Sequence, residues 1–504
     1  MFSVPNLSDL NAGAALPAIF LGVYACLLMI VDLFIPRTRK QITVALTLIG
    51  LGAALVLALL ALGDVVEFGD GALAFGGMYV ADRFSDAVNV TVLITAILGV
   101  LVAYNYLERI HRQRSEYYYL LLFTTLGVMV MGAAGDLVIV FVALELLSIP
   151  LYILSGFRWP QEASEESALK YFILGAFSSG FLVYGIALVY GATGTTDFRA
   201  LWQSIEQIVV SDASSKYLLL VGTGLVLVGL GFKVAAVPFH MWTPDVYQGA
   251  PTSVVAYMSV AAKVGGFAAL ARVLGAGMGN LTLGSEAAAA WQSTVWIIAA
   301  LTMILGNVVA IVQSDLKRLL AYSSIAHAGY LLIGVAAAGT PAVADEAARA
   351  VIMYLAAYAF TNVGAFAVII AVEKDDASNT GLDSMRGLAA RQPLLAASMA
   401  VFMLSLTGIP LTAGFVGKWF VFKSAVAADL IPVAVIGVLT SLVSAYYYLR
   451  IVWYMYFEQG KGEAYVPAPL AWAISIATVG TLVLGIFPYL LSDLANGITL
   501  AFGP

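Results

Sequence analysis

The chain has little charge and very few metal-binding side chains for its length. Of its 504 residues, 11% are charged, and there are three histidines and one cysteine. A single cysteine, Cys26, excludes an internal disulfide and a thiolate metal cluster, and the histidines lack metal-ligand spacing. A soluble domain carries about 25% charged residues, so the composition argues against a soluble protein. The net charge of −6 argues against nucleic acid as a partner.

Hydrophobic residues make up 62% of the chain and occur in long runs from end to end. Because about 20 apolar residues cross the hydrocarbon core as a helix, we predict an all-α, polytopic membrane protein in the lipid bilayer. Residues 1–504 should form a single transmembrane domain with about 14 transmembrane helices and no strands. The runs are 16–36, 41–63, 87–107, 117–134, 137–157, 168–190, 217–239, 253–274, 291–312, 316–338, 350–372, 393–422, 430–457 and 468–491.

The charges between these runs predict the orientation in the membrane. Basic loops between membrane spans face the cytoplasm. Basic residues cluster between the first and second runs, the third and fourth, and the ninth and tenth, whereas the segment 64–86 is acidic. The alternation places both termini on the non-cytoplasmic side. The first run is too long for a signal-peptide core and has no basic region before it, so it should be retained as a span.

Two of the predicted helices contain proline, which removes a backbone donor and clashes with the preceding turn. Pro238 should break helix 7 and Pro410 should break helix 12. Helices 4–8 and helices 9–13 are each groups of five, so the second group enters the membrane from the opposite side. Broken helices at matching places in two inverted repeats are typical of transport proteins. Direct sequence similarity between the halves is faint, limited to Gly231-Phe232-Lys233 against Gly414-Phe415-Val416-Gly417-Lys418.

The predicted division of the chain follows from these two groups. N-terminal helices 1–3 occupy 1–110, the first inverted repeat 117–274, the second inverted repeat 291–457 and the C-terminal helix 468–491.

Four charged residues lie inside apolar runs or at their breaks: Glu145, Lys233, Lys263 and Lys418. A charge at bilayer depth costs roughly 2.5–3.5 kcal/mol on insertion scales, so a retained one is usually functional. Lys263 is the clearest case, since no acidic residue lies within ten residues of it. Glu145 could instead form a structural ion pair, and Lys233 could reach the interface with its long side chain.

Two further residues are candidates on weaker grounds. Lys170 lies near the start of helix 6 and could simply pair with Glu165 or Glu166. His327 lies in the middle of helix 10, where a lone histidine is more often a packing residue but could also relay protons.

Together these side chains are predicted to form a row across the bilayer. Lys170 and Lys233 should lie toward the cytoplasm, Glu145, Lys263 and His327 near the middle, and Lys418 toward the far side. Such a row suits proton movement because each transfer is short. A lysine removed from water releases its proton more readily and a nearby carboxylate opposes this, so movement of Glu145 relative to a lysine would act as an electrostatic switch.

Several long phrases resemble one family of membrane proteins over nearly the whole chain. The chain is similar to the antiporter-like membrane subunits of NADH:quinone oxidoreductase (respiratory complex I) and of multisubunit sodium/proton antiporters. Within that family, the helix count, the phrase ALKYFILGAFSSGF and the lysine in GFVGKW look most like the N subunits. The other phrases are DLVIVFVALELLSIPLYILSGF, GFKVAAVPFHMWTPDVYQGAPTSV and SDLKRLLAYSSIAHAGYLLIGV.

The resemblance implies a proton-translocating subunit in a bacterial cell (inner) membrane. It implies that Glu145 is the family's helix-5 glutamate and that Lys170 and Lys233 are its lysines of helices 6 and 7. Lys263 and Lys418 would be its lysines of helices 8 and 12. It also implies that the partners are the other membrane subunits and the peripheral redox arm, which would hold NADH, FMN, iron–sulfur clusters and quinone, with no cofactor on this chain.

Two other functions remain open from the sequence. The chain could belong to a cation/proton antiporter without a redox partner, or it could be a passive scaffold whose buried charges only hold helices together.

Overall fold

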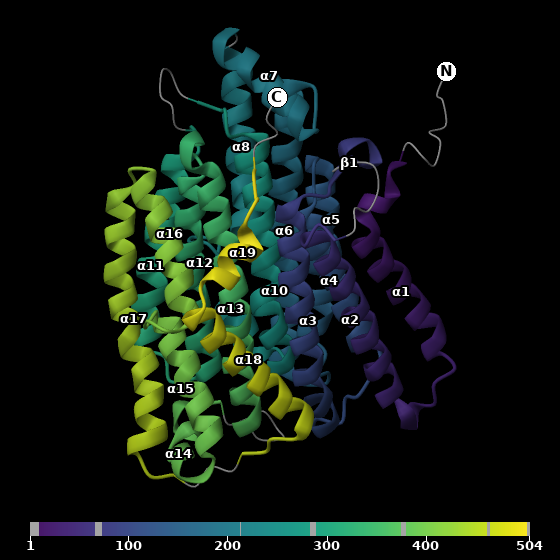
Figure 1. Ribbon diagram of the computed structural model, residues 1–504, viewed down its shortest axis with the longest axis vertical. Coiled ribbons are helices and arrows are strands. Elements are labelled where there is room, and N and C mark those ends of the chain that lie inside the picture. Colours follow the sequence, from purple (N-terminus) through teal and green to yellow (C-terminus); the bar gives the residue numbers. More distant parts are fainter. Residues whose placement is uncertain are drawn as a thin grey trace.

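Helices that run roughly alongside one another make up nearly the whole computed structural model (Figure 1). The structure describes residues 10–65, 73–211, 213–282, 289–373, 380–460 and 464–500. The long helices are α1 (Leu16–Asp32), α2 (Gln41–Leu62), α3 (Arg83–Arg109), α4 (Glu116–Gly132), α5 (Leu137–Ser155), α6 (Glu162–Thr193), α8 (Ala213–Val234), α10 (Thr252–Leu270), α11 (Gln292–Ile311), α12 (Leu316–Ala337), α13 (Ala344–Val372), α15 (Pro393–Thr407), α16 (Ala413–Ala427), α17 (Ile431–Phe457) and α18 (Ala468–Ile486).

Shorter elements connect or extend these helices. They are α7 (Phe198–Ser211), α9 (Trp242–Gly249), α14 (Leu388–Arg391), α19 (Tyr489–Ala495), the π-helical turn Ala271–Gly277 that continues α10, and the 3₁₀ turns Ala12–Ala15, Arg37–Arg39, Phe75–Gly77, Pro341–Val343 and Leu382–Met385. In Figure 1, α7 and α14 lie at opposite ends of the bundle, and we refer to the α7 end and the α14 end accordingly.

The all-α, polytopic membrane fold predicted from the sequence is confirmed. Within the described residues, 12 helices are long and apolar enough to cross a membrane, and Glu116–Gly132 and Pro393–Thr407 are shorter apolar helices. Each of the predicted runs overlaps a helix, and the run 393–422 is divided between α15 and α16.

The prediction that the chain has no strands is wrong in one place. Residues Leu73–Ala74 (β1) and Tyr79–Val80 (β2) pair antiparallel, with Leu73 opposite Val80. The connection contains Gly76 and Gly77, both with positive φ. Glycine adopts that conformation without steric cost, which allows so short a hairpin at a helix connection.

The chain leaves helical conformation at both places where proline predicts a break. Helix α8 ends at Val234, and α9 begins only at Trp242. Helix α15 ends at Thr407, with Gly408 at a φ of 93°, and α16 begins at Ala413. Each break therefore leaves backbone carbonyl groups without partners inside their own helix.

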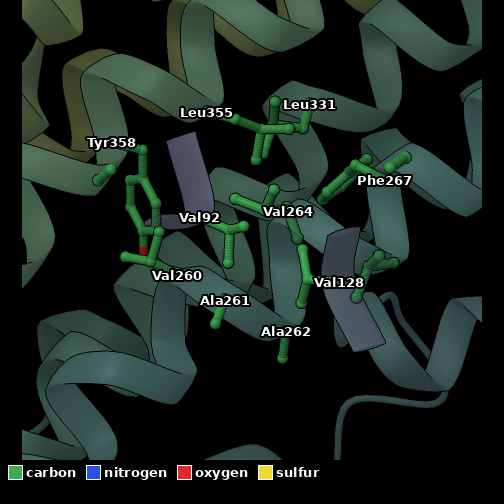
Figure 2. Packing of buried hydrophobic residues seen from close by; sticks show 14 of the residues in the cluster. Val92, Val128, Val260, Ala261, Ala262, Val264, Phe267, Leu331, Leu355 and Tyr358 are labelled. Carbon is green, nitrogen blue, oxygen red and sulfur yellow. The ribbon is translucent and has the colours of Figure 1, made fainter. Parts of the chain in front are cut away.

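Helix α10, which carries Lys263, is buried along its entire length. Every residue from Thr252 to Leu270 is buried, and the helix packs against α3, α4, α5, α8, α12 and α13. Figure 2 shows Val264 of α10 packed near Leu331 of α12 and Leu355 of α13. Lys263 is thus held in the protein interior rather than at the lipid surface.

A buried ion pair fixes the end of this central helix. Arg272 directly follows α10, is 1% exposed, and reaches Asp82 in bidentate fashion, with Nη1–Oδ2 at 2.7 Å and Nη2–Oδ1 at 2.5 Å. Its Nε also donates to the carbonyl oxygen of Gly132 at the end of α4 (2.9 Å). Asp82 in turn caps α3 by accepting from the backbone N–H of Ser85 (2.9 Å). Arg272 therefore ties α10 to α3 and α4.

We predict that Asp82→Asn destabilises the protein far more than Ser85→Ala. Asparagine still caps α3, but it leaves the buried guanidinium of Arg272 without a counter-charge, which costs about 3–5 kcal/mol. Ser85→Ala removes one member of the capping box and should cost about 1 kcal/mol. Heating detergent-solubilised protein and measuring the folded fraction compares the two. A loss for Asp82→Asn no larger than that for Ser85→Ala would show that Arg272 does not depend on the charge of Asp82.

Candidate functional site

The last backbone carbonyls of the helices before the two breaks, α8 and α15, accept hydrogen bonds from buried lysines of other helices. The carbonyl oxygen of Val234, the last residue of α8, accepts a hydrogen bond from Lys263 Nζ (3.3 Å). The carbonyl oxygens of Leu406 and Thr407, the last residues of α15, accept from Lys418 Nζ (2.9 Å each). The C-terminal end of a helix carries unpaired carbonyls and a partial negative charge, so it stabilises a cation. Each break therefore creates a cation site inside the bundle.

The two lysines are not held equally well. Lys418 Nζ has a third partner, Ser441 Oγ (2.8 Å), and lies 4.7 Å from the centre of the Tyr330 ring. Lys263 Nζ bonds only to Val234 O within the described residues. Both side chains are almost fully buried. Within the described residues, the ammonium of Lys418 thus has three hydrogen-bond partners, whereas that of Lys263 has one.

Lys233 of α8 bonds to a serine of α5 that lies one turn from Glu145. Lys233 Nζ donates to Ser148 Oγ (2.8 Å) and Tyr171 Oη (3.0 Å). Ser148 is three residues after Glu145, so both lie on one face of α5. Glu145 Oε1 accepts from Ser179 Oγ of α6 (2.5 Å). Within the described residues Lys233 and Glu145 form no direct ion pair.

Lys170 lies apart from this buried group, in an ion-pair network on α6, α9 and α12. Its Nζ contacts Glu166 Oε1 (2.6 Å) and Asp245 Oδ2 (2.7 Å), and its side chain is 41% exposed. Asp245 Oδ1 also accepts from Arg318 Nη1 (2.9 Å). An open polar cavity of about 230 Å³ is lined by Glu166, Lys170, Asp245 and their neighbours. This network joins α6 and α9 of the first half to α12 of the second.

Sequence reasoning missed Asp245. Its signal was available, because it is the one carboxylate in the segment GFKVAAVPFHMWTPDVYQGAPT around the broken helix. Its partners Lys170 and Arg318 are about 75 residues away in either direction, so the network could not be read from local spacing.

Both ring nitrogens of His327 have hydrogen-bond partners. Its Nδ1 lies 2.6 Å from Tyr354 Oη on α13, and its Nε2 lies 3.1 Å from Tyr448 Oη on α17. Tyr448 Oη bonds further to Ser323 Oγ. A neutral imidazole donates from one nitrogen and accepts at the other, so either tautomer is satisfied here. This arrangement lets the ring exchange a proton at both nitrogens.

The structure therefore groups the candidate residues in three places. Lys263 bonds to the carbonyl of Val234 at the end of α8, and Lys233, the preceding residue, directs its ammonium to Ser148 of α5 and Tyr171 of α6. Lys418 lies at the end of α15, and His327 lines a small cavity there together with Leu406 and Gly417. Lys170 lies in the third place, paired with Asp245. The faint match between Lys233 and Lys418 has no structural counterpart, because Lys233 precedes its break and Lys418 follows its own.

Comparison with known proteins places this fold and these buried charges in one class. Residues 134–444 match the model of the NADH:quinone oxidoreductase/Mrp antiporter transmembrane family. The match covers both broken helices and all the candidate residues, so the class is that of antiporter-like membrane proteins.

Relatives over the whole length narrow the family. NADH-quinone oxidoreductase subunit N of Trichlorobacter lovleyi is 43% identical, with 97% of this chain and 96% of the relative covered. A chain of respiratory complex I from Thermus thermophilus is 36% identical with a TM-score of 0.80, covering 95% of this chain and 100% of that one. A chain of the Mrp complex from Dietzia is 23% identical with a TM-score of 0.77, covering 97% and 96%, and shares the fold. The chain belongs to the family of NADH-quinone oxidoreductase N subunits.

We predict that Ser148→Ala destabilises the protein more than Ser155→Ala. Both serines lie on α5, are fully buried and donate to a carbonyl four residues earlier. Only Ser148 also accepts from the Lys233 ammonium, and a hydrogen bond to a charged group contributes roughly 1.5–3 kcal/mol. The difference in thermal unfolding midpoint between the two variants measures that bond. A difference of zero would mean that water or Tyr171 replaces it.

Proposed function

We propose that this chain is a membrane subunit of NADH:quinone oxidoreductase that translocates protons, driven by electron transfer from NADH to quinone in other subunits. It is thus part of a translocase, and the redox chemistry takes place elsewhere. The observation that carries the proposal is the pair of interrupted helices whose carbonyl ends hold Lys263 and Lys418 inside the bundle. Family membership supports the same reading.

In this scheme Lys263 is the central proton carrier. It is buried at mid-helix in α10, and one carbonyl oxygen holds its ammonium. Lys233 precedes Val234 by one residue in the chain, but its ammonium bonds to Ser148 Oγ and Tyr171 Oη rather than to that carbonyl. The two ammonium groups therefore have separate partners.

Glu145 and Lys233 form the switch that redox chemistry operates. The carboxylate lies one turn from Ser148, which bonds to Lys233, and its bond to Ser179 ties it to α6. A change in charge near α5 or α6 would change how strongly Lys233, and then Lys263, holds its proton. His327 and Lys418 carry the proton through the second half, and Lys170 with Asp245 forms the entry from one surface.

The remaining features follow from the family and from the loop charges. We propose that helices 4–8 and 9–13 are inverted repeats, within 117–274 and 291–457, and that the α14 end faces the cytoplasm. Both termini would then lie on the opposite side of a bacterial inner membrane. The redox arm and the neighbouring membrane subunits would hold NADH, FMN, iron–sulfur clusters and quinone.

A cation/proton antiporter without a redox partner is the second candidate. The likeness to the Mrp chain favours it only at the level of the fold. Co-purification in mild detergent separates the two, because flavin and iron–sulfur subunits should accompany this chain in one case and not in the other.

We expect Lys263→Ala to abolish proton pumping while the complex still assembles. Alanine removes the titratable group that bonds to the last carbonyl of α8, and the carbonyl of Val234 is then without its cation. The matched control is Lys423→Ala, which removes an exposed lysine paired with Glu346 (2.8 Å). Pumping in proteoliposomes during NADH oxidation is the measurement. A fully assembled Lys263→Ala complex that pumps with unchanged stoichiometry would refute the central-carrier assignment.

Glu145→Gln should impair coupled turnover more than assembly. Glutamine keeps an oxygen for Ser179 but removes the charge that acts on Lys233. The control is Glu346→Gln, a surface carboxylate on α13. NADH:quinone reductase activity and assembly on native gels are compared for both variants. Loss of assembly without any defect in the assembled fraction would make Glu145 a structural residue.

A further inference from the structure

Two hydrogen-bonded pairs of side chains, Ser324–Tyr358 and His327–Tyr354, connect α12 and α13. We call each pair a rung and the two together a ladder. Ser324 and His327 lie one turn apart on α12, and Tyr358 and Tyr354 lie one turn apart on α13. Tyr358 Oη donates to Ser324 Oγ (3.1 Å), and Tyr354 Oη bonds to His327 Nδ1 (2.6 Å). The ring centres of Tyr358 and His327 are 5.1 Å apart. The rungs are therefore stacked and in contact.

The hydroxyl of Tyr247 extends this ladder to α9, the helix that follows the break in the first half. Tyr247 of α9 places its Oη 3.4 Å from Ser324 Oγ. Helix α9 lies at the α14 end of α12, because Lys317 Nζ donates to the carbonyl oxygen of Ala250 (2.7 Å). All three hydroxyl-bearing side chains are nearly inaccessible to solvent. The chain Tyr247–Ser324–Tyr358 thus runs from α9 inward to the level of His327.

A cavity of about 10 Å³ joins the two rungs. This is about the space that one water molecule needs. Its walls include His327, Tyr354 and Tyr358, together with Thr361 and Ser405. Leu406 also lines it, and the carbonyl of Leu406 is a partner of Lys418. A proton that reaches the cavity is therefore next to both His327 and the helix end that holds Lys418.

The side of the ladder that faces Val260 and Val264 of α10 is apolar. Figure 2 shows Tyr358 beside Val260 of α10, with Val264, Leu331 and Leu355 in the same layer. Charge does not cross such a layer without polar groups to carry it, because an ion in a low-dielectric interior is strongly disfavoured. The hydroxyls of Ser324 and Tyr358 provide the hydrogen-bonded crossing.

We propose that Tyr247, Ser324 and Tyr358 form a hydroxyl relay that exchanges protons between the α9 end of the bundle and His327, alongside the route through Lys263. This inference rests on the proposed function, since it adds relay residues to the same translocation path. Asp245 and Arg318 hold α9 against α12 and so keep Tyr247 within reach of Ser324.

The transfer leaves every hydroxyl neutral. Each oxygen accepts one proton from the preceding group as it gives its own to the next, so one O–H bond forms and one breaks at each step. In the structure Tyr358 donates to Ser324. Rotation about the C–O bonds turns the chain so that Ser324 donates to Tyr358 and Tyr358 donates into the cavity. His327 then accepts the proton, through one water molecule in that cavity.

The test is Tyr358→Phe in the complete complex, reconstituted in proteoliposomes. The change removes one oxygen and keeps the ring. We expect proton translocation to fall about tenfold, as for one raised transfer barrier, with assembly retained. The matched control is Tyr117→Phe, which breaks an equally buried bond from a tyrosine to a serine, Tyr117 Oη to Ser253 Oγ (3.2 Å), away from the ladder. Wild-type pumping in Tyr358→Phe, or an equal loss in Tyr117→Phe, overturns the relay.

Ser324 provides a second, independent readout. Ser324→Ala should reduce pumping as Tyr358→Phe does, and Ser324→Thr, which keeps the hydroxyl, should restore it. If threonine and alanine are equally impaired although assembled, the serine acts through packing and the relay is wrong. Lys263→Ala is measured in the same assay. If Lys263→Ala stops pumping while Tyr358→Phe does not, the relay alone fails; if Lys263→Ala pumps normally, the central-carrier assignment of the proposed function fails.

Discussion

The structure depends on backbone carbonyl groups that two interrupted helices leave free in the interior of the bundle. In a continuous helix those carbonyls would be bonded to their own helix, and a lysine at the same depth would have no partner. The breaks after Val234 and Thr407 solve both problems at once, because each exposed helix end is an acceptor with a partial negative charge and each nearby lysine is a donor. The cost of a buried ammonium is thereby reduced without a permanent counter-ion, which would hold the proton in place.

The two helix ends hold their lysines unequally. Lys418 is held by two carbonyls and a hydroxyl, whereas Lys263 has one carbonyl. Lys233 and Glu145 have other partners, Ser148 and Tyr171 for the lysine and Ser179 for the carboxylate. Under the proposed function, the first half responds to charge near α5 and α6, and the second half accepts the proton that the first releases.

The sequence predicted the helices, the breaks and the buried charges, because hydrophobic runs, prolines and isolated lysines are local signals. It could not predict the partners. The acceptor of Lys263 is a carbonyl 29 residues away on another helix, and Asp245 joins Lys170 to Arg318 across three helices. The tyrosines around His327 look like ordinary membrane-protein residues in the sequence. Only the packing of α12 against α13 and α17 brings them to the histidine. The small hairpin at Leu73 was missed because two-residue strands leave no periodic pattern.

The break in the second half is tightly packed in this structure. Gly408 has a φ of 93° and caps the end of α15, and Leu411 also has positive φ, a conformation that holds only where the surroundings impose it. Gly414, the second residue of α16, lies so close to Ser405 that a Cβ would clash with the backbone there, and its N–H donates to Ser405 Oγ (3.0 Å). Any opening of the helix around Lys418 would have to disrupt these contacts. Proton transfer along bonded side chains and water, as in the proposed function, needs no such rearrangement of the half-helices.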